Sequence, residues 1–157
     1  MSLAARIALV RPGGGLIFQR MSQRFDLLNP LKTRTELIAS LRYVVGAGYA
    51  MECTAIRTDH HDDRGLQSKG APWEETHGGG FAVDLWLLRV GGRAGDYEDA
   101  STPRFRAWLA TIARSPYHGQ TGLVGDGADC AANFAAAGPT AFEDAGAPHT
   151  HMSCKAA

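Results

Sequence analysis

Hydrophobic positions recur at helical spacing in the segment 33–46. The apolar side chains that share one face of this predicted helix are Leu37, Ile38, Leu41, Val44 and Val45. Thr33 and Glu36 stand in the positions of a capping box, in which Thr33 accepts a hydrogen bond from the amide of Glu36. Gly46 and Gly48 are residues that end helices. The pattern therefore predicts a helix over 33–46.

A second helix is predicted to open at Thr102-Pro103, because proline is well tolerated at the first helical position. It would end at Ser115-Pro116, and its buried stripe would consist of Phe105, Trp108, Leu109 and Ile112. The alanine-rich segment 131–137, which precedes Gly138-Pro139, predicts a further helical turn.

Short apolar or alternating runs predict strands over 49–56, 81–88, 119–124 and 149–154. The run at 81–88 is almost continuously apolar, which is typical of a strand buried on both faces. Near the N-terminus, residues 6–10 and 16–19 are apolar runs separated by Arg-Pro-Gly-Gly-Gly, a pattern that predicts a hairpin with a loose loop. The chain after it, from Phe25 to Leu31, reads as irregular.

These elements predict an α+β fold, with a small, mostly antiparallel sheet and two main helices. A length of 157 residues is typical of a single domain, and 45% hydrophobic residues can fill its core. We expect residues 1–32 to form an N-terminal arm or hairpin and residues 33–154 to form the core.

The composition limits the classes of binding partner that we expect for this chain. Sixteen basic residues balance 16 acidic ones, so no net charge favours nucleic acid or an anionic membrane. No apolar run reaches the length of about 18 residues that a transmembrane helix needs. The first residues lack the pattern of a signal peptide, so we expect synthesis in the cytoplasm. The three cysteines contain no C-x-x-C pair, which argues against a cysteine zinc site; a bridge between Cys130 and Cys154 stays open.

Candidate metal ligands stand in two separated stretches. His77 and Asp84 belong to the pattern H-x-x-G-x-A-x-D, and His149-Thr-His151 lies near the C-terminus. Asp84 falls within an apolar strand, where a carboxylate is costly unless it is paired or binds a metal. Alternate residues of a strand share a face, so Asp84, His149 and His151 would converge if strands 81–88 and 149–154 are neighbours. His77, Asp84 and one of the two later histidines would then form a site suited to Zn²⁺.

The pair of motifs resembles the zinc D-Ala-D-Ala carboxypeptidases and their relatives, which include phage L-alanyl-D-glutamate endopeptidases and the hedgehog amino-terminal domain. The resemblance covers roughly residues 33–154. It implies the hedgehog-type zinc peptidase fold, with His77, Asp84 and His151 as zinc ligands. It places His149 beside the zinc-bound water as a catalytic group.

The resemblance also implies that Arg57, at the end of the preceding predicted strand, binds a substrate carboxylate or the developing oxyanion. His60 and Glu75 would contact substrate at the rim of the cleft. Many relatives carry a carboxylate three residues before the last ligand, whereas this chain has Pro148 there. His149 would replace that carboxylate as the base, or Glu143 or Asp144 would reach in from the preceding loop.

The sequence therefore predicts a zinc metallopeptidase, either a carboxypeptidase or an endopeptidase, that hydrolyses peptidoglycan stem peptides and acts as a monomer. Such an enzyme without a signal peptide fits an endolysin-like phage or prophage protein that is released by lysis or carried in a virion. The alternative is a catalytically silent structural or assembly module of the same fold, metal-binding or metal-free, which the missing carboxylate at position 148 favours.

Overall fold

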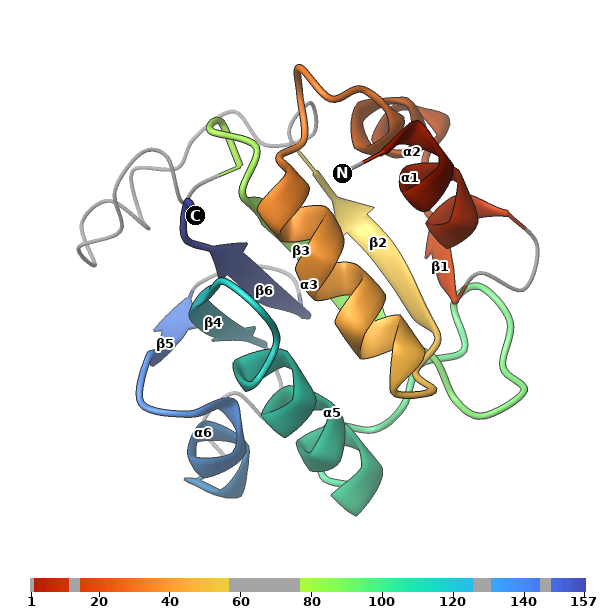
Figure 1. The fold of residues 1–157 in the computed structure, drawn as a ribbon. Coiled ribbons are helices and arrows are strands. Elements are labelled where there is room, and N and C mark those ends of the chain that lie inside the picture. Colours follow the sequence, from red (N-terminus) through yellow and green to blue (C-terminus); the bar gives the residue numbers. More distant parts are fainter. Residues whose placement is uncertain (1, 12–14, 57–76, 126–130, 145–147) are drawn as a thin grey trace.

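The computed structural model describes residues 2–11, 15–56, 77–125, 131–144 and 148–157, and these form one mixed sheet with helices packed around it (Figure 1). The described strands follow the order β1-β2-β3-β6-β4-β5 across the sheet. Their bounds are β1 Leu16–Phe18, β2 Met51–Ala55, β3 Ala82–Leu87, β4 His118–Val124, β5 Ala141–Asp144 and β6 His149–Cys154. The helices are α1 Leu3–Val10, α2 Met21–Leu28, α3 Thr35–Gly46, α5 Pro103–Ala113 and α6 Ala131–Ala137.

The α+β class is confirmed, but the expectation of a small, mostly antiparallel sheet is wrong. Antiparallel pairing joins the central strands, β2 with β3, β3 with β6 and β6 with β4. Parallel pairing adds β1 to β2 at one edge and β5 to β4 at the other. Each parallel strand returns through helices, α2 and α3 after β1 and α6 before β5, which is the connection that parallel pairing requires.

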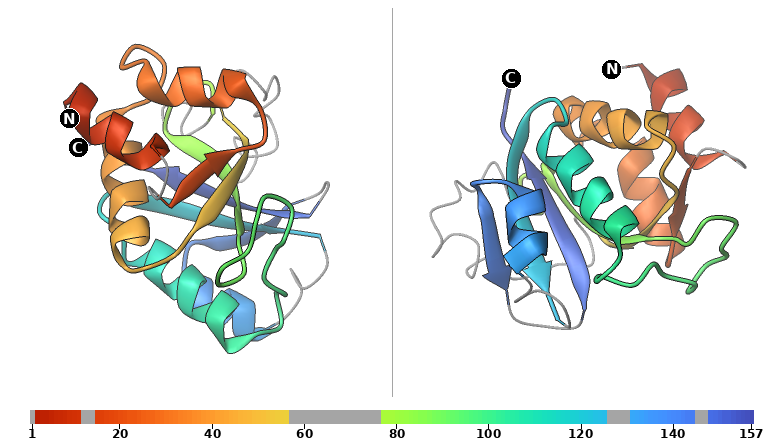
Figure 2. Two further views of the ribbon diagram at one scale, coloured as in Figure 1. Left: turned by 90° about the vertical axis from the view of Figure 1, so that its right-hand side faces the viewer. Right: turned by 90° about the horizontal axis from the view of Figure 1, so that it is seen from below.

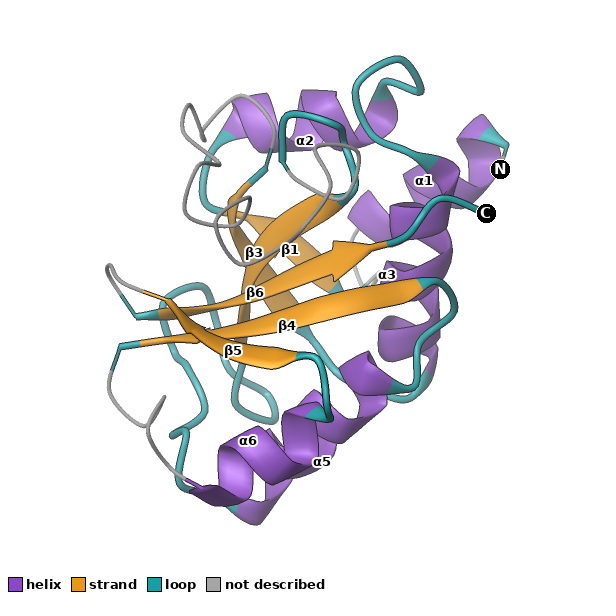
Figure 3. Ribbon diagram, turned by 90° about the vertical axis from the view of Figure 1, so that its left-hand side faces the viewer, coloured by secondary structure: helices purple, strands orange, loops and turns teal. Residues whose placement is uncertain are grey.

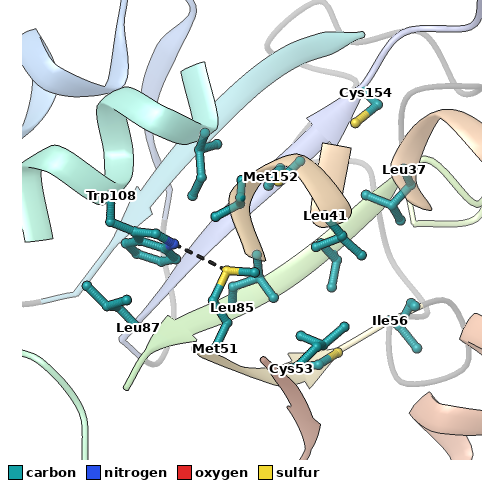
Figure 4. Packing of buried hydrophobic residues seen from close by; sticks show 14 of the residues in the cluster. Leu37, Leu41, Met51, Cys53, Ile56, Leu85, Leu87, Trp108, Met152 and Cys154 are labelled. Carbon is teal, nitrogen blue, oxygen red and sulfur yellow. Dashed lines mark hydrogen bonds between the residues drawn. The ribbon is translucent and has the colours of Figure 1, made fainter. Parts of the chain in front are cut away.

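Helices α3 and α5 cover one face of the sheet (Figures 2 and 3). Leu37 and Leu41 of α3 and Trp108 of α5 pack there on side chains that point inward from the central strands (Figure 4). The inward side chains from these strands are Met51, Cys53, Val83, Leu85, Leu87, Met152 and Cys154. The alternate residues of the same strands face the other way, and Asp84, His149 and His151 are among them.

The predicted N-terminal hairpin is wrong. Residues 3–10 form α1, whose N-cap Ser2 accepts a hydrogen bond from the amide of Ala5 through its side chain. Leucine and alanine dominate this segment and favour helix over strand. The segment 16–18 does form a strand, yet it pairs with β2 instead of with residues 6–10. Much of the region expected to be irregular belongs to α2.

The predicted capping box of α3 is also wrong, because the side chain of Thr33 bonds to α2 instead. Its hydroxyl donates to the carbonyl of Asp26 over 2.8 Å, and Arg34 is the N-cap residue of the helix. The side chain of Thr102, by contrast, caps α5 by accepting from the amide of Phe105, as the Thr-Pro start suggests. In the described part of the chain, no helix is long and apolar enough to cross a membrane.

Candidate metal centre

Two of the predicted ligands lie opposite each other at the centre of the sheet. Asp84 of β3 is paired with His151 of β6, and both residues are about 2% exposed. The Nδ1 atom of His151 lies 2.9 Å from Oδ1 of Asp84. Antiparallel pairing brings directly opposite side chains together on one face of a sheet, so the strand register itself creates this contact.

His77 reaches the same point from the turn 77–80, immediately before β3. This turn is attached to the chain ahead of α3, since Arg34 donates its amide to the carbonyl of Gly80 over 3.0 Å. Gly80 has a φ of +84°, and a Cβ atom there would lie 2.4 Å from the carbonyl oxygen of Lys32. Glycine is thus required at this position by its backbone conformation and by the close approach of another segment.

The three donor atoms form a compact triangle. Nε2 of His77 lies 3.2 Å from Oδ1 of Asp84 and 3.2 Å from Nδ1 of His151. The side chain of His77 is fully buried. In a tetrahedral zinc site with bonds of about 2.0–2.1 Å, adjacent ligand atoms are about 3.3–3.4 Å apart. The triangle is therefore close to the size of one face of such a tetrahedron.

While Asp84 is ionised, protons alone cannot make all three edges of this triangle attractive. If both facing nitrogens carry hydrogen, the edge between His77 and His151 brings two N–H groups together. If either nitrogen lacks hydrogen, its lone pair faces the carboxylate of Asp84. A cation between the three atoms would attract the lone pairs of both nitrogens and the carboxylate oxygen, so these residues fit a metal ion. His77, Asp84 and His151 form a buried group that could hold one.

Gly122 and Phe142 support His151 from the side of β4 and β5, and sequence reasoning did not identify them. Gly122 is paired with His151 in the register, and a Cβ atom on it would lie 2.9 Å from Cβ of His151 and 2.8 Å from Cζ of Phe142. The ring centroids of Phe142 and His151 are 6.0 Å apart. A glycine within a strand can signal such a close approach, which is the one cue that the sequence offers.

His149 lies beside the triangle but contacts the other carboxylate oxygen. Its Nε2 is 3.5 Å from Oδ2 of Asp84, and its side chain is 17% exposed, in contrast to the buried ligand candidates. His149 and Asp84 line an open cavity of about 370 Å³. The other residues lining it are Gln19, Thr54, Ala55, Trp86, Tyr97 and Pro148. Among the described residues, the candidate centre thus has an accessible side where Asp84 and His149 meet the cavity.

The remaining predicted site residues have different outcomes. Arg57, His60 and Glu75 lie outside the described residues, as does Cys130 of the open disulfide question. Sγ of buried Cys154 lies 3.3 Å from the hydroxyl oxygen of Ser40.

Glu143 pairs with Leu123, which pairs with Thr150, so the side chain of Glu143 belongs to the face opposite His151. That orientation disfavours Glu143 as a base at this centre, whereas the side chain of Asp144 lies outside the described part.

Comparison with protein families, curated proteins and solved structures finds no match to this chain.

Proposed function

We propose that this chain is a zinc-dependent metallopeptidase that hydrolyses amide bonds in bacterial cell-wall peptides. The observation that carries the proposal is the buried triangle of His77, Asp84 and His151, with His149 beside it at the edge of an open cavity. Two imidazoles and one carboxylate are a ligand set that suits zinc, and three protein ligands are typical of catalytic zinc sites. The choice of cell-wall peptides rests on the resemblance of the two motifs.

Zinc bound by these residues would polarise a carbonyl group and lower the pKa of a bound water molecule. The chain itself would supply orientation and proton transfer. Asp84 and His151 are held by paired strands, which fixes their donor atoms in a rigid frame. His149 lines the cavity, and its Nε2, which lies 3.5 Å from Oδ2 of Asp84, would hold or move a proton. Arg57 would bind a substrate carboxylate or the oxyanion, a role that rests on the resemblance.

The experiment measures zinc content and hydrolysis of purified peptidoglycan on the same preparations, with and without a chelator. We expect about one zinc ion per chain and activity that disappears with the metal. His151→Ala should lose both. His149→Ala should keep its zinc but lose activity by about two orders of magnitude or more, the usual scale for acid–base catalysis.

His118→Gln is the matched control, because His118 lies on β4 and its Nε2 contacts the hydroxyl of Thr121 at 2.8 Å, away from the triangle. It should keep both zinc and activity. Loss of zinc in His149→Ala would make His149 a ligand. Stoichiometric zinc without hydrolysis by the unmodified protein would instead favour the alternative, a silent metal-binding module.

A further inference from the structure

Glu52 is a buried carboxylate on β2, and its position has no explanation in the metal centre. It is 3% exposed and lies in a strand of otherwise apolar or small residues. A carboxylate in such a place is costly unless its oxygens are hydrogen-bonded. Both oxygens accept hydrogen bonds from the loop 88–100: Oε1 from the hydroxyl of Tyr97 over 2.9 Å, and Oε2 from the amide of Gly95 over 3.0 Å.

Tyr97 is held from several sides. Its ring stacks on Trp86 with centroids 5.0 Å apart and an interplanar angle of 15°. Trp86 is paired with Glu52 across β3 and β2, and its Nε1 donates to the carbonyl of Pro148 over 2.7 Å. Burial and the hydrogen bond to Glu52 raise the pKa of Tyr97 to about 12, so its hydroxyl remains a donor at neutral pH.

The stacked rings form a wall beside the candidate metal centre. Trp86, Tyr97 and Pro148 line the cavity that reaches Asp84 and His149. The same three residues also line a second open cavity of about 480 Å³, which continues toward Asp99 and Ser101. The two cavities therefore share these three residues as one wall, and Asp84 and His149 line only the first of them.

We propose that this shared wall binds the part of a peptide substrate that extends beyond the scissile bond, and that Glu52 is the positioning residue that holds Tyr97 in it. The inference rests on the proposed peptidase function for its substrate class. Among the described residues, Glu52 hydrogen-bonds to the loop through Tyr97 and Gly95, so it would act through the wall and not on the reacting atoms. A minimal substrate that ends near the scissile bond should not depend on it.

The test compares Glu52→Gln, Tyr97→Phe and the double variant on two peptides. The cleaved bond is first identified by mass spectrometry of digested peptidoglycan, and stem peptides are then made that either end at the residues flanking it or extend further. In Glu52→Gln, an amide whose oxygen accepts from Gly95 can offer Tyr97 only its NH₂, so the Tyr97 hydroxyl loses the charged acceptor that Glu52 provides. We expect KM for the extended peptide to rise about tenfold, with kcat within about twofold and zinc content unchanged.

KM for the minimal peptide should stay at the wild-type value. In the double variant, the rise in KM for the extended peptide should be much smaller than the product of the two single rises, because both changes remove the same contact between Tyr97 and Glu52. Asp96→Asn is the matched control, an exposed carboxylate of the same loop that lies 3.5 Å from Arg89. It should behave as wild type on both peptides.

Equal losses on both peptides, or a loss confined to kcat, would overturn the positioning role and leave Glu52 as a structural residue. Unchanged KM on both peptides would overturn it as well. Wild-type protein without zinc-dependent hydrolysis would overturn the proposed function instead. Calorimetric titration of a complete stem peptide, which needs no knowledge of a cleaved bond, into wild type and Glu52→Gln would then decide the binding claim, which fails if both bind equally or neither binds.

Discussion

Gly122→Ala tests whether the packing between β4 and β6 fixes the position of His151. The added Cβ would lie 2.9 Å from Cβ of His151 and 2.8 Å from Cζ of Phe142. Carbon atoms in contact prefer separations of about 3.5–4.0 Å, so each approach is too short by about 0.6–1.2 Å. The ring of Phe142 is half-buried on the edge strand β5 and can swing aside.

His151 has no comparable freedom. Its Cβ is bound directly to a backbone that is hydrogen-bonded to strands on both sides, and its ring faces Asp84 at 2.9 Å. Relieving the clash between the added Cβ and His151 therefore requires β4 and β6 to move apart near the site. Overpacking of this kind costs about 1–3 kcal/mol, and we expect about 2 kcal/mol in the free energy of unfolding. We also expect zinc affinity to fall at least about tenfold, since a displacement near 0.5 Å already degrades a preorganised site.

The assay combines urea unfolding of the metal-free protein with a competition titration of zinc against a chromophoric chelator. Gly119→Ala on the same strand is the control, because its Cβ would approach Ser153 at 3.1–3.2 Å and none of the donor side chains. It should cost less stability and keep wild-type zinc affinity. Wild-type zinc affinity in Gly122→Ala would refute the reasoning, because it would mean that Phe142 alone yields and that Gly122 does not set the position of His151.

Three further predictions concern other parts of the fold. Gly80→Ala should cost at least about 2 kcal/mol in urea unfolding and weaken zinc binding, because the residue has a φ of +84° and its Cβ would meet the carbonyl of Lys32; unchanged zinc affinity would contradict the role of this turn in holding His77. Arg6→Leu should lower the free energy of unfolding by about 3 kcal/mol, since the buried guanidinium donates to the carbonyls of Leu27 and Thr33 over 2.6 Å each; a loss below about 1 kcal/mol would show that water replaces both bonds. Burial, and then the charge of Lys155, lower the pKa of His118 below the value of about 6.5 that it has in the unfolded chain. Between these two pKa values the unfolded chain binds more protons than the folded protein, so the free energy of unfolding falls as the pH falls. His118→Gln should remove this component, and unfolding curves of the two proteins that run parallel from pH 7.5 to 5.5 would contradict it.

Local signals predicted the elements that position the donors. The helical stripe of α3 and the Thr-Pro start of α5 are encoded within a few residues, and the apolar run of β3 and the alternation of β6 are equally local. Because side chains alternate along a strand, the convergence of Asp84 with His151 followed as soon as β3 and β6 were taken as neighbours. In the structure β3 and β6 are neighbours, and Asp84 pairs with His151.

Contacts between distant segments account for what the sequence did not predict. The hydroxyl of Thr33 bonds to Asp26, and this tertiary contact prevails over the local capping box. The residues 141–144 lack a clear alternation of apolar and polar side chains, and they become a strand by pairing with β4 in parallel. The strand pattern alone would predict an exposed side chain for Glu52. Its carboxylate instead accepts hydrogen bonds from Gly95 and Tyr97, in a loop more than 40 positions later. No single-sequence pattern specifies such partners.

The frame of the candidate centre is built from the central strands of the sheet. Asp84 and His151 project from the central strands, whose opposite face packs into a core of apolar side chains from α3 and α5. Small domains that depend on a structural metal lack such a core and usually enclose the ion with four protein ligands. Here the described residues bring three donors together, and the side next to Asp84 and His149 opens into a cavity. A site that rests on such a core, and whose described residues open into a cavity on the side of Asp84 and His149, is arranged as a catalytic site would be. This is why we favour an enzyme over a structural module.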